Sequence, residues 1–236
     1  MKLYTVNYGR NKISFALRRG NRKTLTISVL PDLSVVVLAP QKVAIKAILE
    51  RVKRRAKWII DKIEYFKAFQ PHGLPKRYIS GETHRYLGRQ YRLKVISNKH
   101  NFVKLSGQYL YIYTARKGDS DYNRKLLYKW YRERAIIKFN IIYRALLKKL
   151  RKYGINGPVL KVKTMKSRWG SCNSHKQTII LNTELIKAPS HCIEYVIMHE
   201  LCHIKYPNHN RQFYDFLALV MPDWIERKKR LEKVVL

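Results

Sequence analysis

The chain has 236 residues, 46% of them hydrophobic and 28% charged, so it can bury a core and is not an intrinsically disordered chain. Its 50 Lys and Arg outnumber its 15 Asp and Glu, which gives a net charge of +35. No apolar run approaches the roughly 20 residues that a membrane helix needs, and the N-terminal residues show no signal-peptide pattern. These features predict a soluble, cytoplasmic protein without a transmembrane segment.

The positive charge extends over the whole chain. The first 120 residues carry 26 Lys and Arg against six Asp and Glu, and the remaining residues carry 24 against nine. Such a field attracts polyanions, so nucleic acid is a possible partner of this basic surface, although a lysine-rich solvated surface would have the same composition. The 17 tyrosines are scattered along the chain, which favours core or rim positions over base-stacking platforms. The three cysteines form no Cys-x-x-Cys pair, which favours reduced thiols.

Residues 1–40 have the alternation and the β-branched runs of strands, and Pro31-Asp32 marks a turn. From Val43 to Phe69 the period changes. Apolar residues recur at intervals of three and four, which predicts one amphipathic helix with a basic opposite face. The stripe consists of Ile48, Val52, Ala56, Ile59, Ile63 and Phe66.

Strand-like sequence returns in residues 77–116, and the turn-like cluster Lys117–Ser120 is the candidate domain boundary. A long helix is expected from Tyr122 to Tyr153, then short strands at 159–165 and 177–181, then helices. No internal repeat is evident. The fold class is therefore α+β, with a β-rich basic N-terminal domain at 1–119 that contains one long helix. A metal-binding catalytic domain is expected at 120–236.

A His-Glu-x-x-His motif lies within an apolar, helix-periodic segment, Ile193–His203. His199 and His203 are four residues apart, so both imidazoles leave the same face of the helix and can reach one ion at about 2.0–2.1 Å. Glu200 points to the edge of that face, where it can take a proton from metal-bound water without binding the metal itself. The motif predicts a metal site, with Zn²⁺ as the cofactor.

Catalytic zinc needs three protein ligands and an open position. Pro207 is expected to end the helix, so the following turn can bring His209 back towards the ion. A carboxylate from a later helix, Asp215 or Glu226, is the alternative third ligand. Cys202 points about 100° away from His203 around the helix and is expected to pack in the core.

Several motifs resemble one family. Lys166–Cys172, then Ile180–Asn182, then the His-Glu-x-x-His helix and Pro207–Asn210 are similar to the YgjP-type group of metallopeptidase-like proteins, neighbours of the SprT and WLM zinc proteases. The resemblance covers at least residues 160–224. It implies a minimal zincin-like core of a helix, a short sheet, the metal helix and a C-terminal helix.

The same resemblance implies the roles of the site residues. His199, His203 and His209 bind zinc, and Glu200 is the catalytic glutamate. Arg168 belongs to a segment that is read as a turn at Gly170. It either pairs with a carboxylate or binds a substrate anion. Residues 177–181 are expected to form an edge strand to which an extended peptide could add.

The first interpretation is a zinc-dependent hydrolase, metallopeptidase-like, that acts on a protein or peptide. Recruitment to proteins bound to DNA would be a variant of this activity. One alternative is a metal-dependent hydrolase of nucleoside triphosphates, in which the positive field holds the phosphates. Another is a basic nucleic-acid-binding module whose zinc is only structural. The last alternative does not explain Glu200, because a structural zinc site needs no unligated carboxylate beside its histidine ligands.

Overall fold

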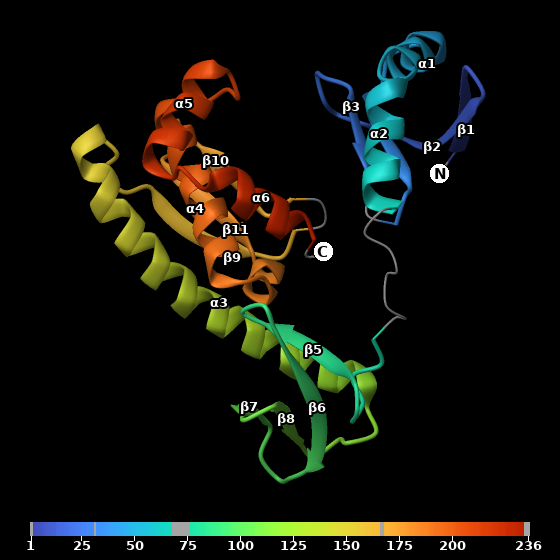
Figure 1. Cartoon of the computed structure of the whole chain (residues 1–236). Coiled ribbons are helices and arrows are strands. Elements are labelled where there is room, and N and C mark those ends of the chain that lie inside the picture. Colours follow the sequence, from blue (N-terminus) through green and yellow to red (C-terminus); the bar gives the residue numbers. More distant parts are fainter. Residues whose placement is uncertain (1, 31, 68–75, 166–167, 234–236) are drawn as a thin grey trace. The chain divides into compact units, whose positions relative to one another are not determined.

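The computed structural model describes residues 2–30, 32–67, 76–165 and 168–233. They form two compact units, one ending at Lys67 and the other running from Lys76 to Lys233. Helices and mixed sheets occur together in both, so the fold is α+β (Figure 1). No helix of the described residues is both long and apolar enough to cross a bilayer.

The first unit is a four-stranded sheet with two helices. Its strands lie in the order β1-β2-β4-β3. They are β1 (Lys2–Tyr8), β2 (Asn11–Gly20), β3 (Thr26–Val29) and β4 (Val35–Pro40), and the helices are α1 (Ile45–Arg54) and α2 (Ala56–Lys67). Its core joins β-branched and aromatic residues of the sheet to apolar residues of both helices, among them Phe15, Val37, Val52 and Ile59.

The single helix expected at 43–69 is in fact two. Arg55 leaves helical geometry, with φ −98° and ψ 7°, and separates α1 from α2. The predicted apolar stripe is nevertheless confirmed at Ile48, Val52, Ala56 and Ile59, which are all buried. The side chain of Phe66 and the residues from 68 onward lie outside the part that the structure describes.

The second unit begins with another four-stranded sheet, followed by a long helix. The strands lie in the order β5-β6-β8-β7. They are β5 (Thr83–Tyr86), β6 (Arg89–Ser97), β7 (Phe102–Ser106) and β8 (Tyr109–Thr114), and the helix is α3 (Ser120–Leu150), which continues as a 3₁₀ turn, Arg151–Tyr153. The buried face of the sheet packs on α3, so Leu93, Leu110 and Ile112 share one core with Leu127 and Trp130.

Because the sheet and α3 share one core, the boundary between the two units lies before this sheet and not after it, as had been expected. The predicted boundary at residues 119 and 120 falls inside the second unit, between a sheet and the helix that covers it. The turn-like cluster that suggested it is the N-terminal cap of α3, where the side chain of Asp119 accepts a hydrogen bond from the backbone N–H of Tyr122. A cap and a linker have similar compositions, which is why the sequence did not distinguish them.

The two four-stranded sheets have the same topology, although no repeat is evident in the sequence. In each sheet the first two strands form an antiparallel hairpin, the second and fourth are parallel, and the third and fourth are antiparallel. Each sheet is followed by helices. The repeat is one of topology, because the corresponding strands β4 and β8 read VVVLAP and YLYIYT.

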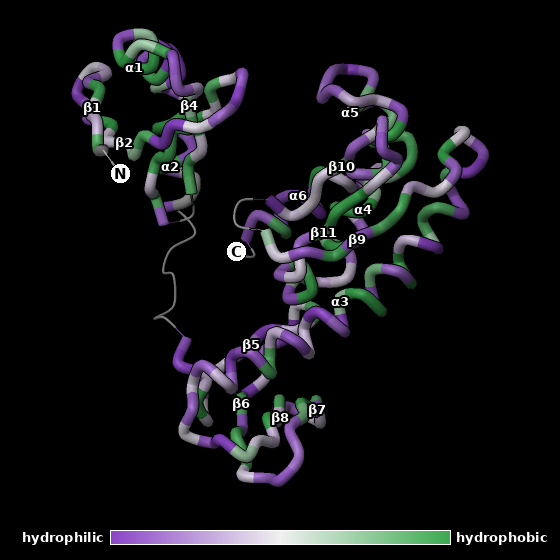
Figure 2. The backbone as a smooth tube through the Cα atoms, turned by 180° about the vertical axis from the view of Figure 1, so that it is seen from behind, coloured by the Kyte–Doolittle hydropathy of each residue, from purple (hydrophilic) through white to green (hydrophobic). Residues whose placement is uncertain are grey.

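The third sheet and the C-terminal helices complete the second unit. The sheet order is β10-β11-β9, and α4 packs on β10 and β11 as well as on α3, α5 and α6. The elements are β9 (Val159–Lys163), β10 (Gly170–Asn173), β11 (Thr178–Asn182), the 3₁₀ turn Thr183–Lys187, α4 (Ser190–Lys205), α5 (Arg211–Val220) and α6 (Trp224–Glu232). In Figure 2 hydrophobic residues are concentrated in α4 and recur along α3, in agreement with the core that these helices share.

The order of this sheet corrects two expectations. The strand expected at the edge, residues 177–181, is β11, which lies at the centre between β10 and β9. The edge next to α4 is instead β10, a strand in a segment that had been read as a turn. Its sequence, Gly-Ser-Cys-Asn, contains no β-branched residue, so nothing in its composition indicated a strand.

Candidate active site

Helix α4 presents one face to the core and another to a cleft. Ile193, Ile197 and Leu201 are fully buried, as their helical spacing predicts. His199 and His203 leave the opposite side and are half-buried. The helix stops at Tyr206, whose N–H still donates to the carbonyl of Cys202, and Pro207 follows it. The chain then turns, so that His209 approaches the other two histidines.

The three histidines converge through their Nε2 atoms. The Nε2 of His199 lies 3.2 Å from that of His203 and 2.9 Å from that of His209, and the last pair is 3.1 Å apart. A hydrogen bond needs one donor and one acceptor, and each Nε2 carries a single proton or a single lone pair in the ring plane. Three mutual approaches therefore cannot all be hydrogen bonds. Two nitrogens on a tetrahedral zinc ion are separated by roughly 3.3 Å, so a metal centre fits this triangle.

The protonation states also suit a metal centre. Burial, together with the neighbouring His203 and His209, lowers the pKa of His199 to about 3. Burial likewise lowers the pKa of His203 and of His209. In addition, Nδ1 of His203 lies 3.1 Å from the carbonyl oxygen of Tyr206 and can donate to it, which leaves the lone pair on Nε2. All three imidazoles are thus neutral at pH 7 and can offer a nitrogen lone pair to a metal ion.

Glu200 is buried beside this triangle, with 6% of its surface exposed. Burial raises the pKa of its carboxyl group to about 8, and the Arg168 guanidinium partly offsets the rise. The space for this side chain exists because residue 170 is glycine. A Cβ atom there would lie 2.6 Å from Oε1 of Glu200. A strongly perturbed carboxyl group in a cleft is typical of a functional site.

An open cleft of about 370 Å³ contains these groups. It is bounded by the edge strand β10 on one side and by α4 and the turn after it on the other. The lining residues are Arg168, Gly170, Ser171, Cys172, Ser174, His199, Glu200, His203, Pro207 and His209. Five of them, Gly170, Ser171, Cys172, Ser174 and Pro207, were not among the predicted site residues. The sequence signal that could have found the first four is their place directly after Arg168 and Trp169.

Comparison with known families identifies the chain. A family model described as YgjP-like, metallopeptidase domain, matches residues 23–234. The chain belongs to this family. A search of curated proteins found no match for this YgjP-like protein. Among solved structures it is similar to the metallopeptidase zymogen of Methanocaldococcus jannaschii jannalysin, with 22% identity over 39% of this chain and 92% of that one. The TM-score of 0.35 is too low to support conclusions about the fold.

The remaining candidates lie away from the triangle. Asp215 is exposed on α5, 3.6 Å from Arg211, and Glu226 is exposed on α6. Among the described residues, neither belongs to the group that could hold a metal ion. Cys202 is fully buried in the core, where burial raises the pKa of its thiol to about 12, and among the described residues it does not belong to the group that could hold a metal ion. All three cysteines are free thiols.

Arg168 lies at the cleft with its side chain exposed. It makes no ion pair among the described residues, and its charge partly offsets the raised pKa of Glu200 at the same cleft. Of the two roles expected for it, pairing with a carboxylate therefore finds no contact in the structure. The neighbouring residues Lys166 and Ser167 lie outside the described part of the chain.

Asn182 joins Met165 and Arg168 to the end of β11. Its side chain is fully buried at the end of β11. The amide N–H groups donate to the carbonyls of Met165 and Arg168, at 2.8 and 2.9 Å, and the amide oxygen accepts from the N–H of Met165 and of Glu184. These bonds satisfy the whole amide and position the start of β10 against α4.

Phe213 forms the floor of the histidine cluster. It is fully buried on α5, and its ring centroid lies 5.0, 4.5 and 4.8 Å from those of His199, His203 and His209. The side chain of Asn210 caps α5 by accepting from the N–H of Phe213. This cap fixes the first turn of α5 directly after His209. Neither contact was expected from the sequence.

Proposed function

We propose that this member of the YgjP-like metallopeptidase family is a zinc-dependent peptidase with a zincin-like catalytic core. The observation that carries the proposal is the convergence of three neutral imidazole nitrogens beside one buried carboxyl group. His199, His203 and His209 would hold the ion, since imidazole nitrogen is a preferred ligand of zinc and three protein ligands leave a position open. Zinc bound there would supply Lewis-acid chemistry and lower the pKa of water.

Glu200 is the group that would move the proton. Glu200 follows His199 in the chain, and its carboxyl group does not belong to the histidine triangle. Because it would not bind the metal, it could accept a proton from the attacking water and return it to the leaving amine. The burial that raises its pKa favours this exchange near neutral pH, whereas a divalent cation nearby would favour the ionised base. Arg168, exposed at the same cleft, would stabilise negative charge that develops on the substrate.

The edge strand β10 would bind the peptide. It pairs with β11 on one side only, and Gly170, Ser171 and Cys172 line the cleft beside Glu200. An extended chain can add to such an edge through backbone hydrogen bonds, which recognise a peptide without regard to its side chains. This role replaces the one first expected of residues 177–181.

The experiment compares wild type with Glu200→Gln, which keeps the shape of the side chain and removes its basicity. Zinc content, casein cleavage, nucleoside triphosphate hydrolysis and cleavage of a DNA–protein crosslink are measured. We expect the variant to retain zinc and to lose at least about 100-fold in peptide turnover, the typical contribution of a general base. Glu226→Gln, at an exposed position on α6, is the matched control and should retain full activity.

The same assays decide between the proposal and its alternatives. Release of pyrophosphate or phosphate from nucleotides without peptide cleavage would establish a phosphoanhydride hydrolase. A zinc-containing wild type without any turnover, unchanged by Glu200→Gln, would establish a structural metal. Cleavage of casein lost in Glu200→Gln supports the peptidase.

A further inference from the structure

The β8 strand carries a row of tyrosines on the face of its sheet that is turned away from α3. Side chains alternate along a strand, so the sequence Tyr-Leu-Tyr-Ile-Tyr divides between two faces. Leu110 and Ile112 are fully buried in the core, whereas Tyr109, Tyr111 and Tyr113 are half-buried on the other face. These three tyrosines hold rim positions, which agrees with the expectation that most tyrosines lie in the core or at its rim.

The rings form a continuous surface, which we call the aromatic row. The centroids of Tyr109 and Tyr111 are 5.9 Å apart, and those of Tyr111 and Tyr113 are 6.1 Å apart with 24° between the ring planes. Phe102 of β7 stacks on Tyr113 at 4.4 Å and 14° and is 44% exposed. One face of Phe102 and one face of Tyr113 therefore cover each other, and the outer faces and edges of the row remain along two neighbouring strands.

Cations flank the aromatic row on both sides. The strand register places Arg92 opposite Tyr109, and Lys94 and Lys104 on either side of Tyr111. The Nζ of Lys94 lies 3.7 Å from the centroid of Tyr109. None of the three cations pairs with a carboxylate among the described residues. Residues 83–114, which form this sheet, include six Lys or Arg and no Asp or Glu.

The fold itself does not require this surface. The first unit has a sheet of the same topology, and the corresponding strand β4 carries Val36 and Leu38 at its half-buried positions, with no aromatic residue. Tyrosines that only filled a core would have their rings covered, and lysines that only kept the protein soluble would not be set between rings. The combination of half-buried tyrosine rings, the exposed Phe102 ring and cations without a carboxylate partner among the described residues is complementary to a chain of bases and phosphates.

We propose that the aromatic row and its flanking cations bind single-stranded nucleic acid. Bases would stack on Tyr109, Tyr111, Tyr113 and Phe102, and the phosphates would lie along Arg92, Lys94 and Lys104. Aromatic rings on an open sheet with a positively charged margin are a general means of binding single strands, because every base has a face that can stack. A duplex keeps its base faces covered and gains nothing from the rings.

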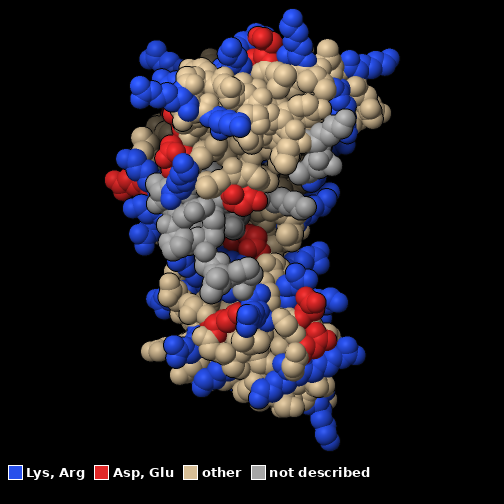
Figure 3. Space-filling view, turned by 90° about the vertical axis from the view of Figure 1, so that its right-hand side faces the viewer, with Lys and Arg blue, Asp and Glu red and all other residues tan. Residues whose placement is uncertain are grey.

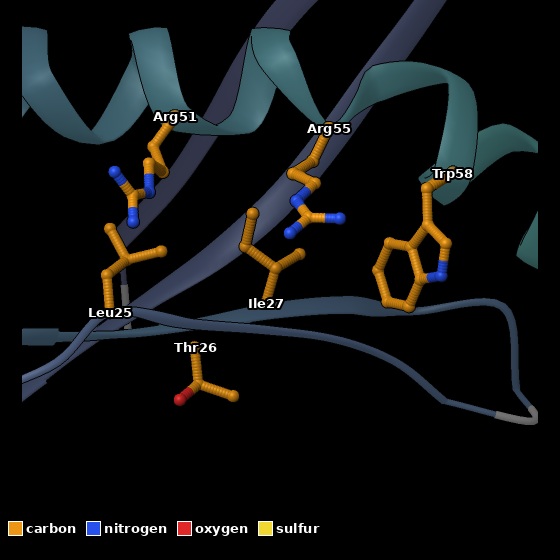
Figure 4. A pocket seen from close by; sticks show the side chains of 6 residues that line it. All are labelled: Leu25, Thr26, Ile27, Arg51, Arg55 and Trp58. Atoms are coloured by element: carbon orange, nitrogen blue, oxygen red, sulfur yellow. The ribbon is translucent and has the colours of Figure 1, made fainter. Parts of the chain in front are cut away.

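A second basic surface offers a rival location. In the first unit a cavity of about 390 Å³ is lined by Leu25, Thr26, Ile27, Arg51, Arg55 and Trp58. Figure 4 shows both arginines and Trp58 extending from the helices towards β3, with Leu25 and Ile27 pointing at them and Thr26 pointing away. This cavity has two cations but a single ring. Lys and Arg are also spread over much of the face seen in Figure 3, so charge alone does not locate a binding site.

The experiment measures the affinity of the full chain for 12-nucleotide oligothymidylate and oligouridylate, a 12-base-pair duplex and heparin, by fluorescence anisotropy. The aromatic variant is Tyr111→Thr with Tyr113→Thr. We expect it to weaken binding of the single strands at least tenfold. Its affinity for heparin, which has no bases, should remain within twofold. Tyr111→Phe with Tyr113→Phe keeps both rings and should bind as wild type does.

The charge variant, Lys94→Gln with Lys104→Gln, should reduce the slope of log K against log salt by about 1.4 for single strands. The matched control, Arg51→Gln with Arg55→Gln, removes two cations from the rival cavity and should leave the affinity within twofold. Single-strand affinity that survives loss of the rings, or that falls as much in the control, would overturn the proposal, as would equal affinity for the duplex. If the threonine variant does not fold, Phe102→Thr tests the same row at an exposed position.

Discussion

The Cα of Gly170 lies against the carboxyl group of Glu200, so close that a Cβ atom there would meet Oε1 at 2.6 Å, Cγ at 2.9 Å and Cδ at 3.0 Å. A residue with a Cβ atom does not fit at position 170 unless the Glu200 side chain moves. The edge strand β10 and the helix α4 therefore pack closely at this contact. The carboxyl group is buried at this contact and lines the same cleft as the three histidines.

The first prediction concerns this contact. Gly170→Ala should displace the Glu200 side chain and lower kcat for peptide cleavage by about 100-fold, because a shift of about 1 Å in a catalytic group can have that effect. It should also destabilise the fold by about 1–3 kcal/mol through overpacking. Gly118→Ala, where nothing lies within 4 Å of the added Cβ, is the control and should change neither quantity. An unchanged kcat in Gly170→Ala would show that the position of Glu200 is not critical.

The second prediction concerns the third imidazole. His209→Ala removes one donor of the triangle and should weaken zinc binding at least about 100-fold, as measured by competition with a chromophoric chelator. His191→Ala removes an exposed histidine of the same helix α4 and should retain the metal as wild type does. Equal zinc affinity of the two variants would exclude His209 as a ligand.

A third prediction follows from the buried amide of Asn182. Asn182→Asp replaces two N–H donors by an oxygen that faces the carbonyls of Met165 and Arg168, and should cost about 2–4 kcal/mol in the free energy of unfolding. Denaturant unfolding measures this loss. Asn173→Asp is a suitable control, because the exposed Asn173 only accepts a bond from Lys176 and the new carboxylate can still accept it. A loss of similar size in both variants would contradict the role of the amide donors.

The fourth prediction concerns pH and His84, which lies buried beside Glu82 in the β5–β6 sheet. Burial lowers the pKa of His84 to about 4, whereas an exposed histidine has a pKa of about 6.5. Between these values the unfolded chain takes up a proton that the folded chain does not. The free energy of unfolding should therefore fall as the pH drops from 6.5 towards 4, by about 1–2 kcal/mol for this group between pH 7 and pH 5.

Urea unfolding at pH 7 and pH 5 tests this prediction. In His84→Gln the loss of stability on acidification should be smaller than in wild type by that amount. His100→Gln, at an exposed position, should lose as much stability between pH 7 and pH 5 as wild type does. If wild type and His84→Gln respond identically to pH, His84 is not held neutral by burial.

The sequence predicted the elements with strong periodicity and missed those that depend on neighbours. The stripe in α4, the long helix expected at 122–153 and the strands β6, β7 and β8 were predicted from spacing and turn residues, whereas β5 was not predicted as a separate strand. The break at Arg55 and the strand that starts at Gly170 leave no local signal, because the first depends on packing against a sheet and the second on pairing with β11. His199 and His203 were placed together by helix geometry, and Pro207 predicted the turn that brings His209 to them, whereas the alternatives Asp215 and Glu226 could be set aside only with the structure.

The aromatic row shows a different kind of failure. The sequence shows a tyrosine at every second residue of this strand, but the tyrosines of the whole chain, considered together, are dispersed. Only the burial of the strand in the structure shows that Tyr109, Tyr111 and Tyr113 lie on one face of the sheet. The domain boundary failed for a related reason, since a helix cap was read as a linker.

The donor triangle is formed within the eleven consecutive residues from His199 to His209, which join the end of α4 to the start of α5. An ion at its centre would cross-link only the end of α4 and the short turn before α5. The sheets and α3 would not need the ion in order to fold. Chelation should therefore free α5 and the turn before it, and hydrogen exchange should speed up there first, while the remote strands stay protected.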